Sequence, residues 1–201
     1  MKNRIIPFGL SIVVLLMIVS CGGDEATIPK SRLYPKITFP ERGYADFDLS
    51  DCPFTLEYPT YATIKTDKYF EDKEPIHPCW FDILMGDINA SIHCSYIPVD
   101  DRKHFDKLVS DAFRMVTEHN VKADARRDSL FVNAAGVEGL FFSINGDVAT
   151  PIQFFMTDSV RHFMRGSLYF DDKVNADSIA PLLSFVREDI DHLLESFQWR
   201  D

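Results

Sequence analysis

The change of hydrophobic period along the chain constrains its fold more than any other feature of the sequence. Four short segments between residues 54 and 97 alternate apolar and polar side chains, as strands with one buried face do. Apolar residues at intervals of three and four then predict an amphipathic helix over residues 105–116. The alternation returns in residues 137–170, and the helical interval returns in residues 178–197. This order predicts an α+β fold, with a mainly antiparallel sheet flanked by helices.

Turn and capping residues mark the ends of these elements. Asp100 or Asp101 is suited to cap the first helix. Asn145-Gly146 suits a type I′ hairpin turn, and Asp158-Ser159 the next turn, so residues 137–170 are predicted to form a three-stranded antiparallel meander. Pro181 is expected in the first turn of the last helix, where backbone donors have no helical partner.

The N-terminal residues have the layout of a secretory signal peptide. Positive charge at Lys2 and Arg4 precedes an apolar stretch over residues 5–19, which is shorter than the roughly 20 residues that a membrane-spanning helix needs. The stretch ends in Ile-Val-Ser-Cys, which resembles the lipobox of bacterial lipoproteins. We therefore expect cleavage after residue 20 and lipid attachment at Cys21, since two or more acyl chains anchor a protein durably. The alternative is an ordinary signal peptide with an incidental cysteine.

The mature chain is expected to consist of a tether and one domain. Residues 21–51 contain scattered prolines and no sustained period, so they predict a lipidated cysteine and an extended tether that reaches about 30 Å. The aromatic residues in the later part of the tether are suited to lie against the domain. Residues 52–201 are long enough for a single α+β domain with its own core.

The acidic composition limits the partners. Loss of residues 1–20 removes two basic residues and changes the formal charge from −10 to −12. Nucleic acid requires clusters of Lys and Arg, so it is excluded as a partner. Anionic headgroups would repel such a surface, so the lipid anchor must provide the attachment to the membrane.

Three cysteines remain in the mature domain. Cys94 falls on the apolar side of an alternating segment and is interpreted as a core residue. Cys52 and Cys79 both lie beside prolines at the starts of predicted strands, and an exported domain meets an oxidising compartment. A Cys52–Cys79 disulfide is therefore favoured over three reduced thiols.

Neither a serine nucleophile elbow, a phosphate-binding glycine loop nor an HExxH motif occurs in the sequence. A zinc site built from His77, Cys79, His93 and Cys94 is disfavoured, because adjacent His93 and Cys94 would point to opposite faces of a strand. We expect no metal, cofactor or catalytic residue.

Two weaker groups of polar residues remain. Asp171, Asp172, Asn175 and Asp177 raise the possibility of calcium, but the segment lacks the central glycine and terminal glutamate of an EF-hand loop. It is interpreted as a solvated loop that caps the last helix.

The second group lies on one predicted strand. Arg161, His162 and Arg165 could bind an anionic ligand, with Asp158 orienting His162. The competing interpretation is that these are ordinary surface groups.

Several stretches resemble the GldD family of gliding motility lipoproteins of Bacteroidetes-type bacteria, in order and across nearly the whole mature chain. They are SDCPFTLEYPTYA, PCWFDI, IHCSYIPV, VKADA, PIQFFMTDSVRHFMRGSLYF and DSIAPLLSFVREDIDHLLESFQW. The family pattern carries cysteines at the positions of Cys52 and Cys79. The order of elements is also similar to the Mog1/PsbP-like sandwich, by analogy of layout.

The resemblance implies an envelope lipoprotein required for gliding and type IX secretion, which binds other proteins of that machinery. It implies no catalytic residues, and the membrane that holds the anchor stays open. The alternatives are a periplasmic lipoprotein that binds a small ligand or calcium, and an envelope hydrolase that uses His77 or His162.

Overall fold

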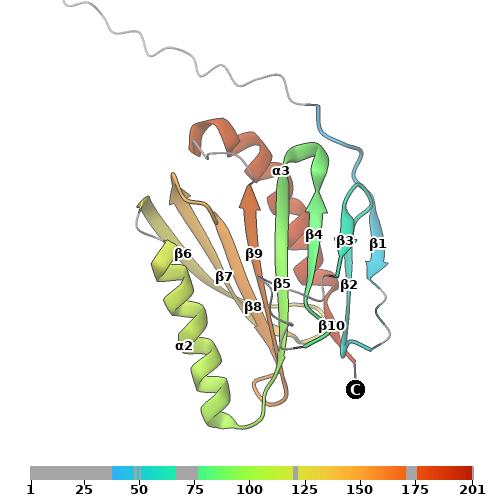
Figure 1. Ribbon diagram of the computed structural model, residues 1–201, viewed down its shortest axis with the longest axis vertical. Coiled ribbons are helices and arrows are strands. Elements are labelled where there is room, and N and C mark those ends of the chain that lie inside the picture. Colours follow the sequence, from blue (N-terminus) through green and yellow to red (C-terminus); the bar gives the residue numbers. More distant parts are fainter. Residues whose placement is uncertain are drawn as a thin grey trace, which may run out of the picture. The chain divides into compact units, whose positions relative to one another are not determined.

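The computed structural model describes residues 38–47, 49, 51–66, 77–119, 122–170 and 176–200, and within them it contains two antiparallel sheets and two long helices (Figure 1). The smaller sheet has the order β1-β2-β10. Its strands are β1 (Tyr44–Phe47), β2 (Phe54–Pro59) and β10 (Gln198–Trp199). The two ends of the domain sequence thus meet in one sheet.

The larger sheet has seven strands in the order β3-β4-β5-β9-β8-β7-β6, and every neighbouring pair is antiparallel. The strands are β3 (Thr63–Lys65), β4 (Phe81–Met85), β5 (Ala90–Pro98), β6 (Ala123–Val132), β7 (Glu138–Gly146), β8 (Ile152–Thr157) and β9 (His162–Phe170). A short 3-10 turn, η1 (Gly86–Ile88), joins β4 to β5. The predicted meander is present as β7, β8 and β9.

The helices are α2 (Arg102–His119) and α3 (Ala176–Ser196). Asp101 caps α2, because its Oδ1 accepts a hydrogen bond of 2.7 Å from the backbone N–H of His104. The predicted α+β class with a mainly antiparallel sheet flanked by helices is confirmed. None of the helices in the described ranges is both long and apolar enough to cross a membrane.

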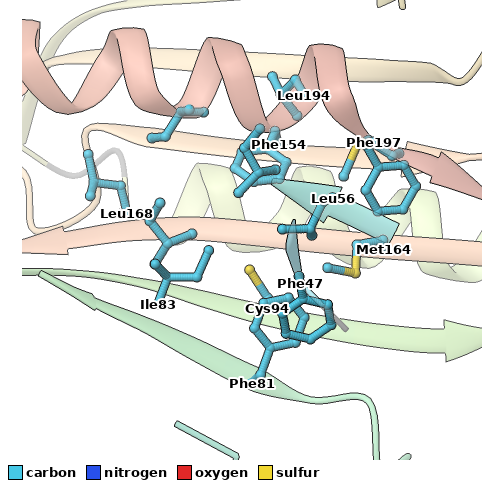
Figure 2. Packing of buried hydrophobic residues seen from close by; sticks show 14 of the residues in the cluster. Phe47, Leu56, Phe81, Ile83, Cys94, Phe154, Met164, Leu168, Leu194 and Phe197 are labelled. Atoms are coloured by element: carbon cyan, nitrogen blue, oxygen red, sulfur yellow. The ribbon is translucent and has the colours of Figure 1, made fainter. Parts of the chain in front are cut away.

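The larger core lies on the face of the seven-stranded sheet that α3 and the small sheet cover (Figure 2). Alternation along β5 produces this arrangement, because Ile92, Cys94 and Tyr96 all enter this core. Phe54 of β2 and Phe197 after α3 are completely buried there, with ring centroids 5.5 Å apart. Cys94 is a free, buried thiol, as predicted.

The smaller core lies on the opposite face of the same sheet, beneath α2. Leu108, Ala112 and Val116 follow one side of the helix at intervals of four. They pack with side chains of β7, β8 and β9, among which Phe142 and Phe163 are almost completely buried.

Of the two predicted turns of the meander, the first differs in the structure. Asn145 and Gly146 remain in β7, where Asn145 is opposite Ala125 of β6, and Gly146 alone has a positive φ of 121°. A type I′ turn would need positive φ at both positions. The glycine is required because a Cβ would lie 2.6 Å from the carbonyl oxygen of Lys122, at the irregular start of β6. Asp158-Ser159 does form the second turn, with Ser159 at φ 62°.

Other differences concern the ends of elements. The last helix begins at Ala176, so Pro181 lies in its second turn and not its first. Residues 44–47, which the sequence alone assigns to the tether, form β1 and pair with β2. The ten-residue strand β6 and the two-residue strand β10 were not predicted. These strands are short or almost wholly exposed, and neither condition produces a clear alternation of apolar residues.

Candidate functional sites

The predicted Cys52–Cys79 disulfide is present in the structure. Its two Cα atoms are 5.6 Å apart, and both residues are almost completely buried. The bond joins the segment that enters β2 to the segment that enters β4. The third thiol is separate, since burial raises the pKa of Cys94 well above its ordinary value. A buried, protonated thiol is a packing group and not a nucleophile.

The four residues of the zinc hypothesis do not converge. Cys79 is in the disulfide. His93 and Cys94 project from opposite faces of β5, with His93 Nδ1 2.6 Å from Asp82 Oδ1 and Cys94 in the larger core. His77 lies edge-on to Tyr96, with ring centroids 4.8 Å apart. Within the described ranges, no three His, Cys, Asp or Glu side chains are placed to hold a metal ion.

Two sets of predicted residues fall outside the described part of the chain. Cys21, the expected lipid attachment site, is one of them. The other set is the acidic segment of the calcium hypothesis, comprising Asp171, Asp172, Asn175 and the side chain of Asp177.

The three basic residues of β9 and its preceding turn are separated by the pleat of the strand. His162 stacks on Trp199, with ring centroids 5.0 Å apart, and its Nδ1 lies 2.8 Å from the hydroxyl of Tyr96. Burial lowers the pKa of His162, so the imidazole is favoured in its neutral form. Arg161 is exposed in the turn. Arg165 points to the opposite face of the sheet, toward α2.

Asp158 has a different role from the predicted one. Its Oδ1 accepts hydrogen bonds from the backbone N–H groups of Val160, Arg161 and His162, at 3.0, 2.8 and 2.8 Å. These bonds lower the pKa of Asp158 against the opposing effect of burial, which is the larger single influence. Asp158 therefore shapes the turn between β8 and β9 through the backbone.

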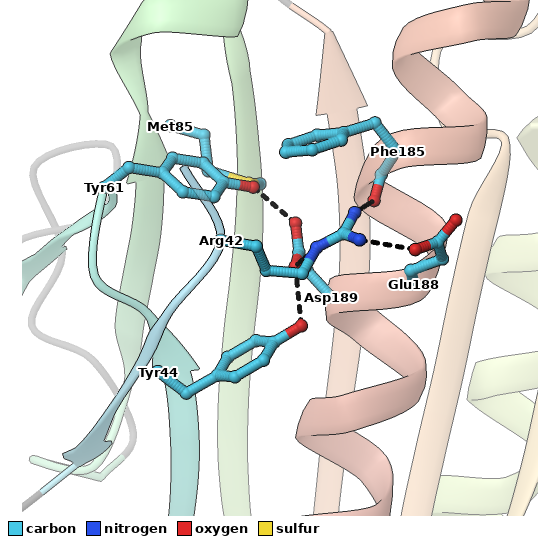
Figure 3. A network of polar contacts seen from close by, with 7 residues as sticks. All are labelled: Arg42, Tyr44, Tyr61, Met85, Phe185, Glu188 and Asp189. Atoms are coloured by element: carbon cyan, nitrogen blue, oxygen red, sulfur yellow. Dashed lines mark hydrogen bonds and ion pairs between the residues drawn. The ribbon is translucent and has the colours of Figure 1, made fainter. Parts of the chain in front are cut away.

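A polar network that no sequence pattern indicated surrounds Asp189, a residue of α3 that is only 1% exposed (Figure 3). Its Oδ1 accepts hydrogen bonds from Tyr44 Oη and Arg42 Nε, each at 2.9 Å, and its Oδ2 accepts one from Tyr61 Oη. Burial, followed by the bond to Asp189, raises the pKa of Tyr44 to about 12. The same influences raise the pKa of Tyr61. All three donors therefore keep their protons at neutral pH.

The network joins the segment before β1 to α3. The guanidinium of Arg42 also donates to Glu188 and to the carbonyl oxygen of Phe185, and its Cζ lies 4.4 Å above the Phe185 ring. Phe39 stacks on the same ring at 4.5 Å. This arrangement fastens the segment from Phe39 to Tyr44 to α3. Arg42 and Asp189 are 147 positions apart and each stands in an ordinary local context, so no sequence signal pairs them.

Strand β6 is one edge of the seven-stranded sheet, with β7 on one side and no strand of the described part on the other. Its first half is charged, and Arg126 pairs with Asp128. Its second half carries two large apolar side chains that are unusually exposed, Leu130 at 87% and Val132 at 67%. An open edge with apolar side chains is a template for pairing with another chain.

Together these features define, in the described part of the chain, an antiparallel α+β domain with a disulfide, an N-terminal segment fastened to α3 and an open sheet edge. A family model described as "Gliding motility lipoprotein GldD" matches residues 24–199. The chain belongs to this family of gliding motility lipoproteins. Membership implies a lipid-anchored protein of the cell envelope with a role in gliding, and the family description favours a non-enzymatic role.

No curated protein is significantly similar to this chain. Among solved structures, the chain is similar to the solution structure of cyanobacterial PsbP (CyanoP) from Synechocystis sp. PCC 6803, with 14% identity and a TM-score of 0.40. The similarity covers 83% of this chain and 98% of the cyanobacterial chain. At this level it carries no functional inference.

Proposed function

We propose that this chain is a lipid-anchored component of the gliding motility and type IX secretion machinery, and that it acts by binding other proteins of the machinery and not by catalysis. Family membership supports the setting. The sequence supports removal of residues 1–20, acylation of Cys21 and a tether over residues 21–51, of which Arg42 and residues 44–47 contact the domain. The lipid then keeps the domain near the membrane while the tether lets it reach a partner.

The observation that carries the binding role is the second half of β6. Leu130 and Val132 are two positions apart on a strand, so they project from the same face. Large exposed apolar groups on a sheet edge are unfavourable in a protein that stays alone, because they promote edge pairing. We propose that they bind an extended segment of a partner protein, which would add a strand beside residues 129–132 and cover both side chains.

The arrangement around His162 argues against the hydrolase alternative. The ring is held between Trp199 and Tyr96, and its Nδ1 already faces the Tyr96 hydroxyl. A general base needs a free lone pair and room for a substrate.

The interface is tested by replacing Leu130 and Val132 with Asp in the native gene. Both side chains are exposed, so the free energy of unfolding should change by no more than about 0.5 kcal/mol. The amount of folded protein should therefore stay the same. We expect surface spreading and secretion of type IX substrates to fall together, and cross-linked complexes with the machinery to disappear.

The matched control is Val160→Asp, because Val160 is as exposed as Val132, at 67%, but lies in the turn between β8 and β9. This variant should keep motility, secretion and complexes. Normal cross-linking by the doubly substituted chain, or equal loss in the control, would contradict the assignment to β6.

The anchor is tested separately by Cys21→Ser. We expect the substituted chain to lose incorporation of radiolabelled palmitate and to leave the membrane fraction, because no acyl chain can then be attached through sulfur. Unchanged labelling would show that the lipid is attached elsewhere.

A further inference from the structure

A cleft of about 790 Å³ lies between α2 and the part of the seven-stranded sheet formed by β4, β5 and β9. It exists because α2 packs on β7, β8 and β9, and no other helix of the described part covers the same face of β4 and β5. Its size falls within the range of small-molecule binding sites. Nothing in the proposed role of β6 uses this cleft.

Arg165 of β9 is the distinctive charged group of this cleft. Its Nη2 donates a 2.7 Å hydrogen bond to Oε1 of Gln153, and its Nη1 contacts the sulfur of Met115 on α2. Gln153 is itself 1% exposed and is held by Thr150, 3.0 Å away. The guanidinium is thus fixed by neutral groups.

The positive charge of Arg165 is not balanced by the described residues. None of their carboxylates forms an ion pair with it, and burial lowers its pKa. A guanidinium has five N–H donors in a planar fork, and a neutral amide and a thioether satisfy few of them. A partly buried cation in this state is a recognised mark of an anion site.

The carboxylates of the cleft, by contrast, each have a side-chain partner of their own. Asp82 lies 2.6 Å from His93 on the neighbouring strand. On α2, Asp111 pairs with Arg114 at 3.1 Å. Asp100, before the helix, is equally close to His104. Each of these carboxylates is thus held by its own partner, and none of them pairs with Arg165.

A second cation lines the same cleft. Lys107 projects from α2 into its lining, and Asp111, one helical turn further on, pairs with Arg114 instead. Arg165 and Lys107 thus place two positive charges on this cleft in a chain of formal charge −10. Neighbouring cations attract and orient an anion.

The remaining walls are largely apolar. Trp80, Ile97 and Phe163 come from the sheet side, and Leu108 and Met115 from the helix. A bare inorganic ion would leave these side chains in contact with water. A molecule with both a charged head and an apolar body would cover them.

We propose that this cleft binds a small organic anion, in which a carboxylate or phosphate head is held by Arg165 and Lys107 and an apolar body lies against Met115 and Leu108. The proposal goes beyond the protein-binding role and does not rest on it.

The test is isothermal titration of the full-length lipidated chain in phosphatidylcholine nanodiscs, with the heat of empty nanodiscs subtracted. The probes are 4-phenylbutyrate, phenyl phosphate and the uncharged 4-phenylbutyramide. We expect at least one anion to bind, and the amide to bind about tenfold more weakly than the carboxylate if the carboxylate is the preferred head. The two anions thus distinguish a carboxylate ligand from a phosphate ligand.

The variants identify the groups responsible. Arg165→Met keeps the apolar stem and should lower the affinity for the preferred anion by about tenfold or more. Lys107→Met should lower the same affinity by about threefold. This substitution is at an exposed position of α2, so it leaves the core intact. Arg161→Met removes a neighbouring arginine outside the cleft and should leave binding unchanged.

Thermal unfolding of each variant shows that it is folded before the titration. Failure of both anions to bind at about 10 mM would overturn the proposal. Binding that is equal in the original chain and in Arg165→Met and Lys107→Met would overturn it as well.

Discussion

The two faces of the seven-stranded sheet are built differently. One face is closed by α3 and by the small sheet, and a continuous aromatic and aliphatic core fills the space between them. On the other face the described helix α2 covers β7, β8 and β9, and a cleft with both charged and apolar side chains remains beside it. The comparison shows that the core on one face can stabilise the whole sheet. The other face can then keep a charged side chain, Arg165, that has no ion-pair partner among the described residues.

Buried charge is treated differently on the two faces as well. On the closed face Asp189 is surrounded by three donors, and its burial is fully compensated. On the open face Arg165 is held by an amide and a thioether. A satisfied network fixes the structure, whereas an unbalanced cation is suited to a ligand.

The largest expected effect is on the free energy of unfolding, when one substitution in each core is compared. Phe54→Ala removes a completely buried ring on the closed face and should lower the free energy of unfolding by about 3–5 kcal/mol. Leu108→Ala on the open face, where the side chain is 8% exposed, should cost about 2 kcal/mol. Urea unfolding followed by circular dichroism measures both. Equal costs would show that the two faces contribute alike, and the comparison would fail.

An intermediate effect separates the two carboxylates. Asp189→Asn places a neutral amide beside Arg42 and leaves fewer acceptor atoms for the hydroxyls of Tyr44 and Tyr61. We therefore expect the free energy of unfolding to fall by about 2–3 kcal/mol. Asp82→Asn loosens a partly exposed pair with His93 and should cost less than about 1 kcal/mol. The same unfolding measurement compares them at neutral pH. A larger loss for Asp82 would reverse the roles assigned to the two faces.

The smallest effect is a change of stability with alkaline pH that arises on the closed face. The pKa of Tyr44 is about 12 in the folded chain against an ordinary 10.0, so the folded state holds this proton more tightly than the unfolded chain. Its contribution is complete below about pH 10 and is lost as the pH rises toward 12. After allowance for solvent screening, we expect a loss of about 1 kcal/mol over this window.

Tyr44→Phe keeps the ring that stacks on His192, with centroids 3.5 Å apart, and removes only the titrating hydroxyl. Unfolding free energies measured between about pH 9 and pH 12 should therefore fall less steeply in this variant. An identical slope in the two proteins would mean that the hydroxyl of Tyr44 does not contribute to the alkaline loss.

Most of the fold could be predicted where burial is one-sided and the segment is long enough to show a period. β5 and α2 are examples, since Cys94 on β5 and Leu108 on α2 each fall on an apolar stripe that the sequence displays. β6 could not be predicted, because its exposed charged half and exposed apolar half have no common alternation. The turn predicted at Asn145-Gly146 was wrong for another reason. The glycine is needed there because the backbone of Lys122 approaches it closely, and not because the chain turns.

The candidate sites were predicted less well than the fold. Arg161, His162 and Arg165 are neighbours in sequence, and the pleat of β9 sends His162 and Arg165 to opposite faces. Only the packing of α2 beside β5 then turns the face around Arg165 into a cleft. The Asp189 network depends on contacts across 147 positions, which no local pattern encodes.

The sequence by itself determined the properties that depend on neighbouring residues. These are the acidic charge, the class of the fold and the family, and the sequence alone also carries the prediction of export and acylation at Cys21. Tertiary structure alone decided which polar groups meet and which remain unbalanced. The physical reason is that periods and turns arise from interactions within a few residues, whereas burial, ion pairing and cleft formation depend on which distant segments pack together.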